Sequence, residues 1–317
     1  MKIIIRKKSY TFQYVLKHHT IGLANTMELR HLRYFIAVAE EENFSRAAVR
    51  LNISQPPLSQ QIKSLEEAIG TPLFRRLSHG VALTSAGKAF LHEAYQTLAS
   101  AQKAVETAQE AARGMVGEMR LGLTSSAIFN PLVTSHIREF QRFSPKVRLH
   151  LTESNTIDLL DALTGGSLDA VYIRPGIATP EKVDLYRMPD EKMKVVVPAT
   201  HPLAQCTSVQ LKALSDESFI FLPAAAGLTL YDDILHSCRN VGFEPVRGQI
   251  APQISSVVNL VAAEMGISFV PASAAQIKVF NVHYLDITGP APIARLGLAT
   301  KQKNLTEVTQ NYLRIIQ

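Results

Sequence analysis

The chain has 317 residues, of which 46% are hydrophobic and 19% are charged, so it is long enough for two or more compact units and has the composition of a globular protein. No uninterrupted apolar run approaches the roughly 18 residues that a membrane span needs, which argues against an integral membrane protein. The formal net charge of +6 is a weak sign of nucleic-acid binding, because residues 1–26 hold five lysine and arginine residues and no acid, and the rest of the chain carries only +1.

Residues 1–26 are expected to be an N-terminal extension. Their basic start lacks the apolar core of about 7–15 residues that a secretory signal needs, because Gln13, Lys17, His18 and His19 interrupt it. We expect these residues to be disordered or to result from a mis-called start codon. A basic arm that contacts DNA is the alternative.

Residues 43–70 predict two short helices joined by a tight turn. Ser45 is the expected N-cap of the first helix, and the second helix begins at Ser54. In the second helix, apolar residues recur at helical spacing: Leu58, Ile62, Leu65 and Ile69. Only Asn52 and Ile53 separate the two helices, which predicts the close crossing of a helix-turn-helix.

The other face of the second helix is polar, and no acid lies between Ser54 and Leu65. Flexible hydrogen-bonding groups on this face reach base edges when the helix lies in a major groove; an ordinary solvated helix pair is the alternative. Residues 71–84 read as a two-stranded wing that turns near His79–Gly80. The expected DNA-contacting residues are Ser45, Arg46, Ser54, Gln55, Pro56, Pro57, Ser59, Gln60, Lys63, Arg75 and Arg76.

Residues 27–84, which run from MELRHLRYF to GVALT, resemble the winged helix-turn-helix of LysR-type transcriptional regulators, and the remainder of the chain resembles the same family. The similarity points to members that respond to aromatic or carboxylate metabolites. It implies a cytoplasmic homodimer or homotetramer that binds double-stranded promoter DNA, a small-molecule effector and RNA polymerase, with no cofactor and no membrane association. It also places the family's usual first residue at Met27.

The chain departs from the family pattern at two places. Many relatives carry Arg where this chain has Gln60, which implies a different base preference or phosphate contact there. The wing tip, residues 78–80, is Ser-His-Gly where relatives are often basic, which implies a weaker wing contact.

A long helix is expected from Thr84, as its N-cap, to about Arg113, and residues 85–114 are assigned to a linker and dimerisation helix. Small and apolar residues follow a heptad seam along it: Gly87, Leu91, Ala94, Leu98, Ala101, Val105, Ala108 and Ala112. Such a seam winds two helices around each other, so we expect a dimer pair, antiparallel or crossed. The alternative is a helix packed only on its own domain.

The predicted fold class is α/β, with the winged helix-turn-helix (27–84), the linker helix and a C-terminal effector-binding domain (118–317). Strand-like segments alternate with helices: MRLGLT (119–124), VRLHLTE (147–153), LDAVYI (168–173), MKVVVP (193–198), FIFLP (219–223), GISFVP (266–271), VHYLDI (282–287) and ARLGLAT (294–300). Two crossings would make two lobes, lobe I at about 118–187 and 290–317, and lobe II at about 188–289. The resemblance implies the same two-lobed sensor, shaped like periplasmic solute-binding proteins.

Effector candidates lie where strands end and helices begin, the usual ligand edge of an open α/β sheet. Hydroxyls at helix starts and a nearby guanidinium suit an anion, and the facing stretch 224–227 is small and apolar, which favours an aromatic or unsaturated carboxylate. Each residue alone could be a helix cap or a surface ion pair, with Asp169 or Glu181 as partners for the arginine. The effector-binding candidates are Thr124, Ser125, Ser126, Thr156 and Arg174 in lobe I, and Pro223 and Ala224, placed by the resemblance, in lobe II.

Neither an enzyme nor a metalloprotein is expected. The sequence holds no GxSxG, GxxxxGK[ST] or HExxH motif and no GxGxxG after a strand, and its histidines are scattered. Cys206 and Cys238 lack metal-ligand spacing and are expected to be inert thiols. The expected function is therefore sequence-specific transcription regulation, switched by a small, anionic metabolite bound between the lobes.

Overall fold

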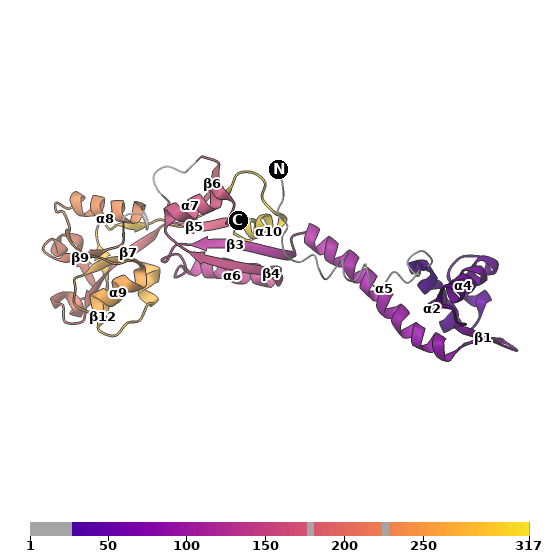
Figure 1. The fold of residues 1–317 in the computed structure, drawn as a ribbon. Coiled ribbons are helices and arrows are strands. Elements are labelled where there is room, and N and C mark those ends of the chain that lie inside the picture. Colours follow the sequence, from indigo (N-terminus) through magenta and orange to yellow (C-terminus); the bar gives the residue numbers. More distant parts are fainter. Residues whose placement is uncertain (1–26, 176–180, 224–227, 317) are drawn as a thin grey trace. The chain divides into compact units, whose positions relative to one another are not determined.

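The computed structural model describes residues 27–175, 181–223 and 228–316. The N-terminal extension expected at 1–26 and the candidate effector residue Ala224 lie outside these ranges. The chain forms two compact units, Met1–Ala108 and Gln109–Gln317, and their division falls within a long helix (Figure 1). Among the described helices, none combines the length and the apolar character needed to cross a bilayer.

The first unit contains a helix-turn-helix and a two-stranded wing. Its elements are α2 (Leu29–Glu41), α3 (Phe44–Arg50), α4 (Gln55–Ile69), β1 (Phe74–Leu77), β2 (Gly80–Leu83) and most of α5 (Ser85–Ala112). The two strands pair antiparallel, from Phe74 opposite Leu83 at the base to Leu77 opposite Gly80 at the tip. The expected wing is therefore present, with its turn at residues 78–79.

The N-cap of α3 is Asn43, so the prediction of Ser45 was wrong. The Asn43 side-chain oxygen accepts hydrogen bonds from the backbone N–H groups of Ser45, at 2.9 Å, and Arg46, at 3.1 Å. An asparagine carbonyl satisfies the free amides of a first helical turn as well as a serine hydroxyl does. Ser54 does take the N-cap position of α4, but its side chain makes no capping hydrogen bond.

One core holds these elements together. Phe35 of α2 and Leu58 and Leu65 of α4 are fully buried in it, and Ala47 and Ala48 of α3 are buried with them. Small alanine side chains allow α3 and α4 to cross closely, which fits the four-residue connection, 51–54, between them.

The linker helix α5 uses its seam in two ways. Its first half packs on the core of its own unit, where Ala94 is buried and Leu91 and Leu98 are partly buried. Further along, Val105 is 52% exposed. The alternative of a helix packed on its own domain therefore holds for the first half of the seam, and the second half keeps an apolar side chain in solvent.

The second unit holds two sheets. In the first, the strand order is β4-β3-β5-β14-β6, with β3, β4 and β5 parallel and β14 antiparallel to β5 and β6. The elements of this lobe are β3 (Val116–Leu123), α6 (Pro131–Phe143), β4 (Lys146–Glu153), α7 (Thr156–Gly165), β5 (Ala170–Ile173), β6 (Val183–Arg187), β14 (Gly297–Lys301) and α10 (Glu307–Ile316). Helices α6 and α10 share one apolar core with this sheet, and α7 shares another.

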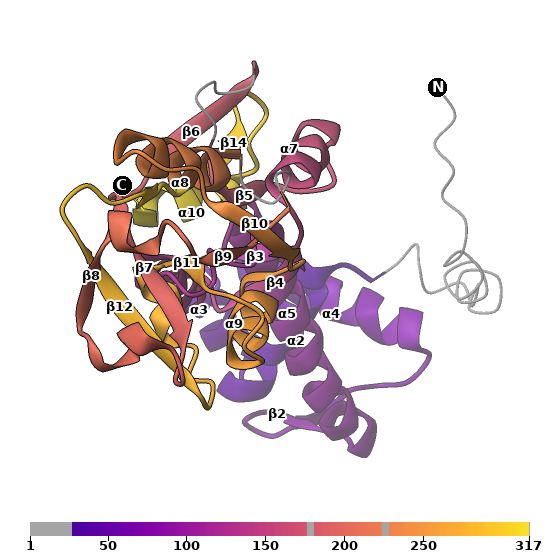
Figure 2. The ribbon, with the colours of Figure 1, turned by 90° about the vertical axis from the view of Figure 1, so that its left-hand side faces the viewer.

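The second sheet has the order β11-β7-β12-β8, and β9 and β10 form a parallel pair beside it (Figure 2). An isolated bridge from Phe219 of β9 to Ile267, just before β11, joins this pair to the sheet. The elements are β7 (Glu191–Pro198), η1 (Pro202–Gln205), β8 (Ser208–Gln210), η2 (Leu211–Leu214), β9 (Ser218–Phe221), α8 (Leu228–Asn240), β10 (Val246–Ile250), α9 (Ile254–Ala262), β11 (Ser268–Pro271), η4 (Ala272–Gln276), β12 (Val282–Thr288) and β13 (Ile293–Ala294). Val195 and Val197 pack in the core of α8, and Val196 packs in the core of α9. Successive side chains of a strand point to opposite faces, so the two helices cover opposite faces of this sheet (Figure 1).

The chain crosses between the two sheets twice. It first passes from β6 to β7, and it returns between β13, which pairs with β7, and β14, which pairs with β5 and β6. The segment 294–300, expected to be one strand, is thus divided at Arg295 because its two ends belong to different sheets. Two lobes joined by two crossings form the expected architecture.

Candidate DNA interface and effector cleft

The polar face of α4 borders a hollow of about 590 Å³ that the wing closes on the other side. Gln55 at the start of α4 is exposed, and its side-chain amide donates to the Ser59 hydroxyl over 2.9 Å, which holds both groups on the open face. The expected DNA-contacting residues that line this hollow are Ser45, Gln55, Pro56, Ser59, Gln60, Lys63 and Arg76. The hollow has the chemistry of a surface that reads base edges and phosphates together.

The remaining expected residues lie outside this hollow. Ser54 and Pro57 are exposed but do not line it, and Arg46 forms an ion pair with Glu41 over 3.5 Å. Lys63 lines the hollow, although it also pairs with Glu67 over 3.6 Å. Surface ion pairs of this kind are weak, so both cations remain able to meet a phosphate.

The two wing arginines differ in direction. Arg75 lies opposite Ala82 and Arg76 opposite Val81, and because neighbouring residues of a strand point to opposite faces, only Arg76 faces the hollow beside α4. Within the described residues, neither guanidinium forms an ion pair, so both are free for phosphate. The prediction from the sequence gave both arginines the same role.

Eight further residues that the sequence did not single out as contacts line the hollow, among them Asn43, Phe44 and Glu66. Asn43 caps α3, and Phe44 packs edge-on against Phe74 of the wing with ring centroids 5.9 Å apart. The acid of this set, Glu66, follows directly on the acid-free stretch 54–65. Only the folded wing brings these residues to one surface.

The two lobes of the second unit enclose a cavity of about 240 Å³. Its lining combines both lobes: Ser125, Glu153, Ser154 and Asn155 from lobe I, and Pro223, Pro252 and Gln253 from lobe II. Of the effector candidates, Ser125 and Pro223 therefore face the cavity directly. Pro252 and Gln253, before α9, carried no signal in the sequence because their role depends on the position of lobe II.

The neighbouring hydroxyl candidates are buried. Thr124 and Ser126 are each 3% exposed and Thr156 is 2% exposed. Neither Thr124 nor Thr156 makes a side-chain hydrogen bond within the described residues. They are not helix caps either, because Asn130 caps α6 and Asn155 caps α7. Two buried hydroxyls without a protein partner beside a cavity are unusual, since such groups are normally satisfied.

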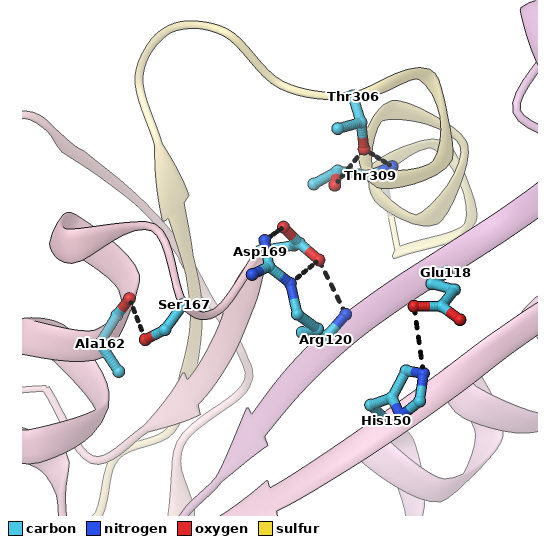
Figure 3. A network of polar contacts seen from close by, with 8 residues as sticks. All are labelled: Glu118, Arg120, His150, Ala162, Ser167, Asp169, Thr306 and Thr309. Atoms are coloured by element: carbon cyan, nitrogen blue, oxygen red, sulfur yellow. Dashed lines mark hydrogen bonds and ion pairs between the residues drawn. The ribbon is translucent and has the colours of Figure 1, made fainter. Parts of the chain in front are cut away.

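Arg174 lies deeper than expected. It is fully buried, and its Nε donates to the Ser126 hydroxyl at 3.0 Å while a terminal nitrogen donates to the Arg295 carbonyl at 3.3 Å. Glu191 is its ionic partner, at 4.0 Å, and Asp169 pairs instead with Arg120 at 2.6 Å (Figure 3). The surface pairing considered for Arg174 is therefore wrong.

Arg174 contacts the Ser126 loop beside the cleft and also residues on both crossings between the lobes. Arg295 lies on the returning crossing, and Glu191 opens β7 after the first one. Burial lowers the pKa of the Arg174 guanidinium to about 10, which Glu191 opposes, so the group is charged at neutral pH. Glu191 also accepts hydrogen bonds from the Ser273 backbone and, at 3.5 Å, from Asn130. Arg174 is thus a buried cation behind the Ser126 loop, and it does not line the cavity.

A winged helix-turn-helix together with a two-lobed α/β domain and an interlobe cavity defines a ligand-responsive DNA-binding regulator as a class. Residues 29–88 match the family described as "Bacterial regulatory helix-turn-helix protein, lysR family", and residues 112–317 match the "LysR substrate binding domain". The chain belongs to the LysR family. It is a DNA-binding transcriptional regulator with an effector-binding domain.

Individual relatives agree with this assignment. The uncharacterized HTH-type transcriptional regulator YnfL of Escherichia coli K12 is 40% identical over 272 residues, which cover 86% of this chain and 91% of YnfL. CbnR, a LysR family regulator of known structure, is 25% identical with a TM-score of 0.83, covering 92% of this chain and 100% of CbnR. CbnR has also been solved with its target DNA, with a TM-score of 0.79 over 92% of this chain and 98% of that one.

A third relative carries a ligand. The BenM effector binding domain with its effector benzoate is 27% identical and has a TM-score of 0.56, covering 63% of this chain and 90% of that chain. Full-length BenM, from Acinetobacter baylyi, is 35% identical over 289 residues, which cover 90% of this chain and 93% of BenM. These relatives are named transcriptional regulators, not enzymes.

Proposed function

We propose that α4 enters the major groove of promoter DNA, with Gln55, Ser59 and Gln60 facing base edges and Arg76 meeting the phosphate backbone. The hollow that these residues share between α4 and the wing supports this orientation. Phosphate contacts give affinity and fix register, whereas base contacts select sequence. CbnR, a relative described above, has been solved bound to its target DNA.

We further propose that a small anionic metabolite binds between the lobes and switches the regulator. The observation that carries this proposal is the pair of buried, unpartnered hydroxyls of Thr124 and Thr156 beside a cavity lined by Ser125. Hydroxyl donors, with the buried charge of Arg174 behind them, suit a carboxylate. Benzoate, the effector bound to BenM, is an acid of this kind.

The apolar lining supports an aromatic or unsaturated body on this acid. Pro223 and Pro252 of lobe II face the cavity, and Pro223 also borders an apolar void of about 20 Å³ in the lobe II core. The rim carboxylate of Glu153 disfavours a second negative charge close to it. A compact monocarboxylate fits this arrangement better than a dianion.

Binding between lobes has a direct mechanical consequence. A ligand held by Ser125 on one side and by Pro223 and Gln253 on the other favours the lobe arrangement in which both sides reach it. Switching requires different affinities for the two arrangements, because equal affinity would shift nothing.

Thermal unfolding with matched ligand pairs tests the site. Benzoate and small unsaturated monocarboxylates should raise the Tm of the effector-binding unit, whereas benzamide, which keeps the ring and lacks the charge, should not. An equal rise with the amide would refute the anionic site, and no rise with any carboxylate would refute the proposed ligand class.

We also propose that the chain is a homodimer joined through α5. In the first unit, a hollow of about 280 Å³ opens between α2 and α5 at the exposed end of the seam, lined by Leu29, Arg33, Leu98, Ala101, Gln102 and Val105. A second copy of α5 would bury the exposed Val105. A two-fold dimer then presents two recognition helices to two half-sites, and tetramers form from such dimers.

A further inference from the structure

The recognition helix is connected to the wing by one carboxylate. Glu66 lies near the end of α4, is half-buried, and its Oε1 accepts hydrogen bonds from the backbone N–H groups of Leu73, at 2.7 Å, and Phe74, at 2.9 Å. Phe74 is the first residue of β1, the strand that carries Arg75 and Arg76, and Leu73 directly precedes it. A carboxylate oxygen that accepts two amides is a charge-assisted bond and is stronger than a neutral one.

The same backbone position also receives the linker helix. The Leu73 carbonyl accepts hydrogen bonds from the Thr84 backbone, at 2.9 Å, and from the Thr84 hydroxyl, at 3.2 Å. Thr84 in turn caps α5 through the Gly87 N–H, at 2.9 Å. Gly87 lies so close to the Leu73 backbone that a Cβ at Gly87 would be 2.1 Å from the Leu73 carbonyl oxygen. The base of the wing is thus held on its amide side by α4 and on its carbonyl side by the start of α5.

Two other contacts also hold the wing, one on its return strand and one at its base, and neither sets its distance from α4. The Val81 N–H donates to the Glu42 carbonyl at 2.9 Å, where the α2–α3 turn passes the return strand. Phe74 packs against Phe35, with ring centroids 5.1 Å apart, and this apolar contact lacks the directionality of a hydrogen bond. Of the described contacts, the two Glu66 bonds are the directional link from α4 to the wing base.

We infer that Glu66 is a positioning residue for DNA binding. It holds the wing at a set distance from α4, so that Arg76 reaches a phosphate while the Gln55 face reaches base edges. The inference rests on the proposed phosphate contact of Arg76. It also explains why an acid lines a surface that binds a polyanion: the oxygen facing the wing is occupied by two amides, and its positioning effect outweighs the repulsion.

The test compares three variants of the full-length protein, Glu66→Ala, Glu66→Gln and Glu67→Ala, on a duplex selected from a random library by the wild type. Glu66→Gln keeps an oxygen that accepts both amides, so it should bind at least as tightly as the wild type. Glu66→Ala should bind about tenfold more weakly, the equivalent of one lost charge-assisted bond. Its log–log salt slope should fall by roughly 0.9, one phosphate contact. Glu67→Ala removes the neighbouring acid, which pairs with Lys63 and touches no wing amide, and should not lower the slope.

The variant Arg76→Ala tests the proposed phosphate contact of Arg76 separately from the positioning role of Glu66. Arg76→Ala should lower the slope by the same roughly 0.9, and the double variant Glu66→Ala/Arg76→Ala should bind no more weakly than Arg76→Ala alone. If Arg76→Ala keeps the wild-type slope, the wing contact of the proposed function is wrong and the inference falls with it. If Arg76→Ala lowers the slope and Glu66→Ala does not, only the positioning role is refuted.

Hydrogen exchange covers the case in which Glu66→Ala impairs folding. The Leu73 and Phe74 amides should exchange faster in Glu66→Ala and at the wild-type rate in Glu66→Gln, while the α2 amides around Phe35 remain protected in both. Unchanged exchange at Leu73 and Phe74 in Glu66→Ala would overturn the inference. Tighter DNA binding by Glu66→Ala and Glu66→Gln alike would also overturn it, because Glu66 would then act only as a repulsive charge.

Discussion

Replacing Thr124 or Thr156 with valine should stabilise the ligand-free effector unit and at the same time weaken its response to the effector. Each hydroxyl is at least 97% buried and makes no hydrogen bond within the described residues. An unsatisfied buried hydroxyl costs about 1–3 kcal/mol, and valine puts a methyl group of similar shape in its place. A gain of about 1 kcal/mol raises the Tm of a domain of this size by roughly 2–4 °C.

The ligand arm of this prediction has the opposite sign. At a concentration 100 times its Kd, an effector stabilises the wild type by about 2.7 kcal/mol. A lost hydrogen bond to a carboxylate, worth about 1.5–3 kcal/mol, weakens binding roughly tenfold or more. The same concentration then corresponds to about ten times the Kd or less, and the stabilisation falls to about 1.4 kcal/mol or less.

The assay is thermal unfolding of wild type, Thr124→Val, Thr156→Val and Thr152→Val, with and without the carboxylate that gives the wild type its largest shift. Thr152 lies exposed on β4, so Thr152→Val is the matched control and should change the ligand-free stability by less than about 0.5 kcal/mol. A lower ligand-free Tm for Thr124→Val would show that this hydroxyl has a protein partner. An undiminished ligand shift in both buried variants would remove these hydroxyls from the site.

Four further outcomes follow from the same structure. Gln55→Ala should reduce discrimination between selected and scrambled duplexes by about 1–3 kcal/mol in mobility-shift titrations, and an equal loss on both duplexes would reject its base-reading role. Arg174→Ala should lower the free energy of unfolding of the effector unit by about 3–5 kcal/mol, measured in urea, because it leaves Glu191 without its cation; a change below about 1 kcal/mol would contradict the buried charge pair. Val105→Glu should shift sedimentation toward the monomer, and an unchanged oligomer would exclude that half of α5 from the interface. Gly87→Ala should lower the Tm of the DNA-binding unit, because its Cβ would lie 2.1 Å from the Leu73 backbone oxygen. An unchanged Tm would show that the backbone at Leu73 or Gly87 moves to accommodate the methyl group without loss of stability.

Strands and helices with a regular apolar pattern were predicted well. The helix expected to begin at Ser54 is α4, and the expected strands 147–153 and 193–198 lie within β4 and β7. Their apolar patterns follow from burial: β4 turns Val147 and Leu149 to one core, and β7 is a continuous apolar run because it packs on two. The strands that were missed, β6, β8 and β10, are short or exposed, so side-chain burial left no periodic pattern in them.

The candidate DNA surface was largely predictable because it is local. Five of its expected residues lie on α4, where the helical period alone places them on one face: Gln55, Pro56, Ser59, Gln60 and Lys63. The exceptions depend on contacts distant in sequence. The separation of Arg75 from Arg76 follows from strand pairing with β2, and the carboxylate of Glu66 acquires its role only when the wing folds back against α4.

The effector cleft was less predictable. Of the effector candidates, Ser125 and Pro223 line the cavity, whereas Thr124, Thr156 and Arg174 are buried behind it. A strand-to-loop pattern shows which residues lie at the carboxyl end of a sheet. It does not show their depth, because depth depends on how the other lobe covers that end.

The sequence by itself determined the class of this protein: a helix-turn-helix with its polar reading face, a wing, a long seam-bearing helix and two sets of alternating strands and helices. These features are local, since helical and strand periodicity depend on neighbours within a few residues. Only the tertiary structure decided which lobe each half of 294–300 joins, that Arg174 bridges the Ser126 loop and the two crossings, and that Glu66 connects the recognition helix to the wing. Those pairings join groups far apart in the chain or in separate elements, and their geometry exists only once hydrophobic burial has brought the elements together.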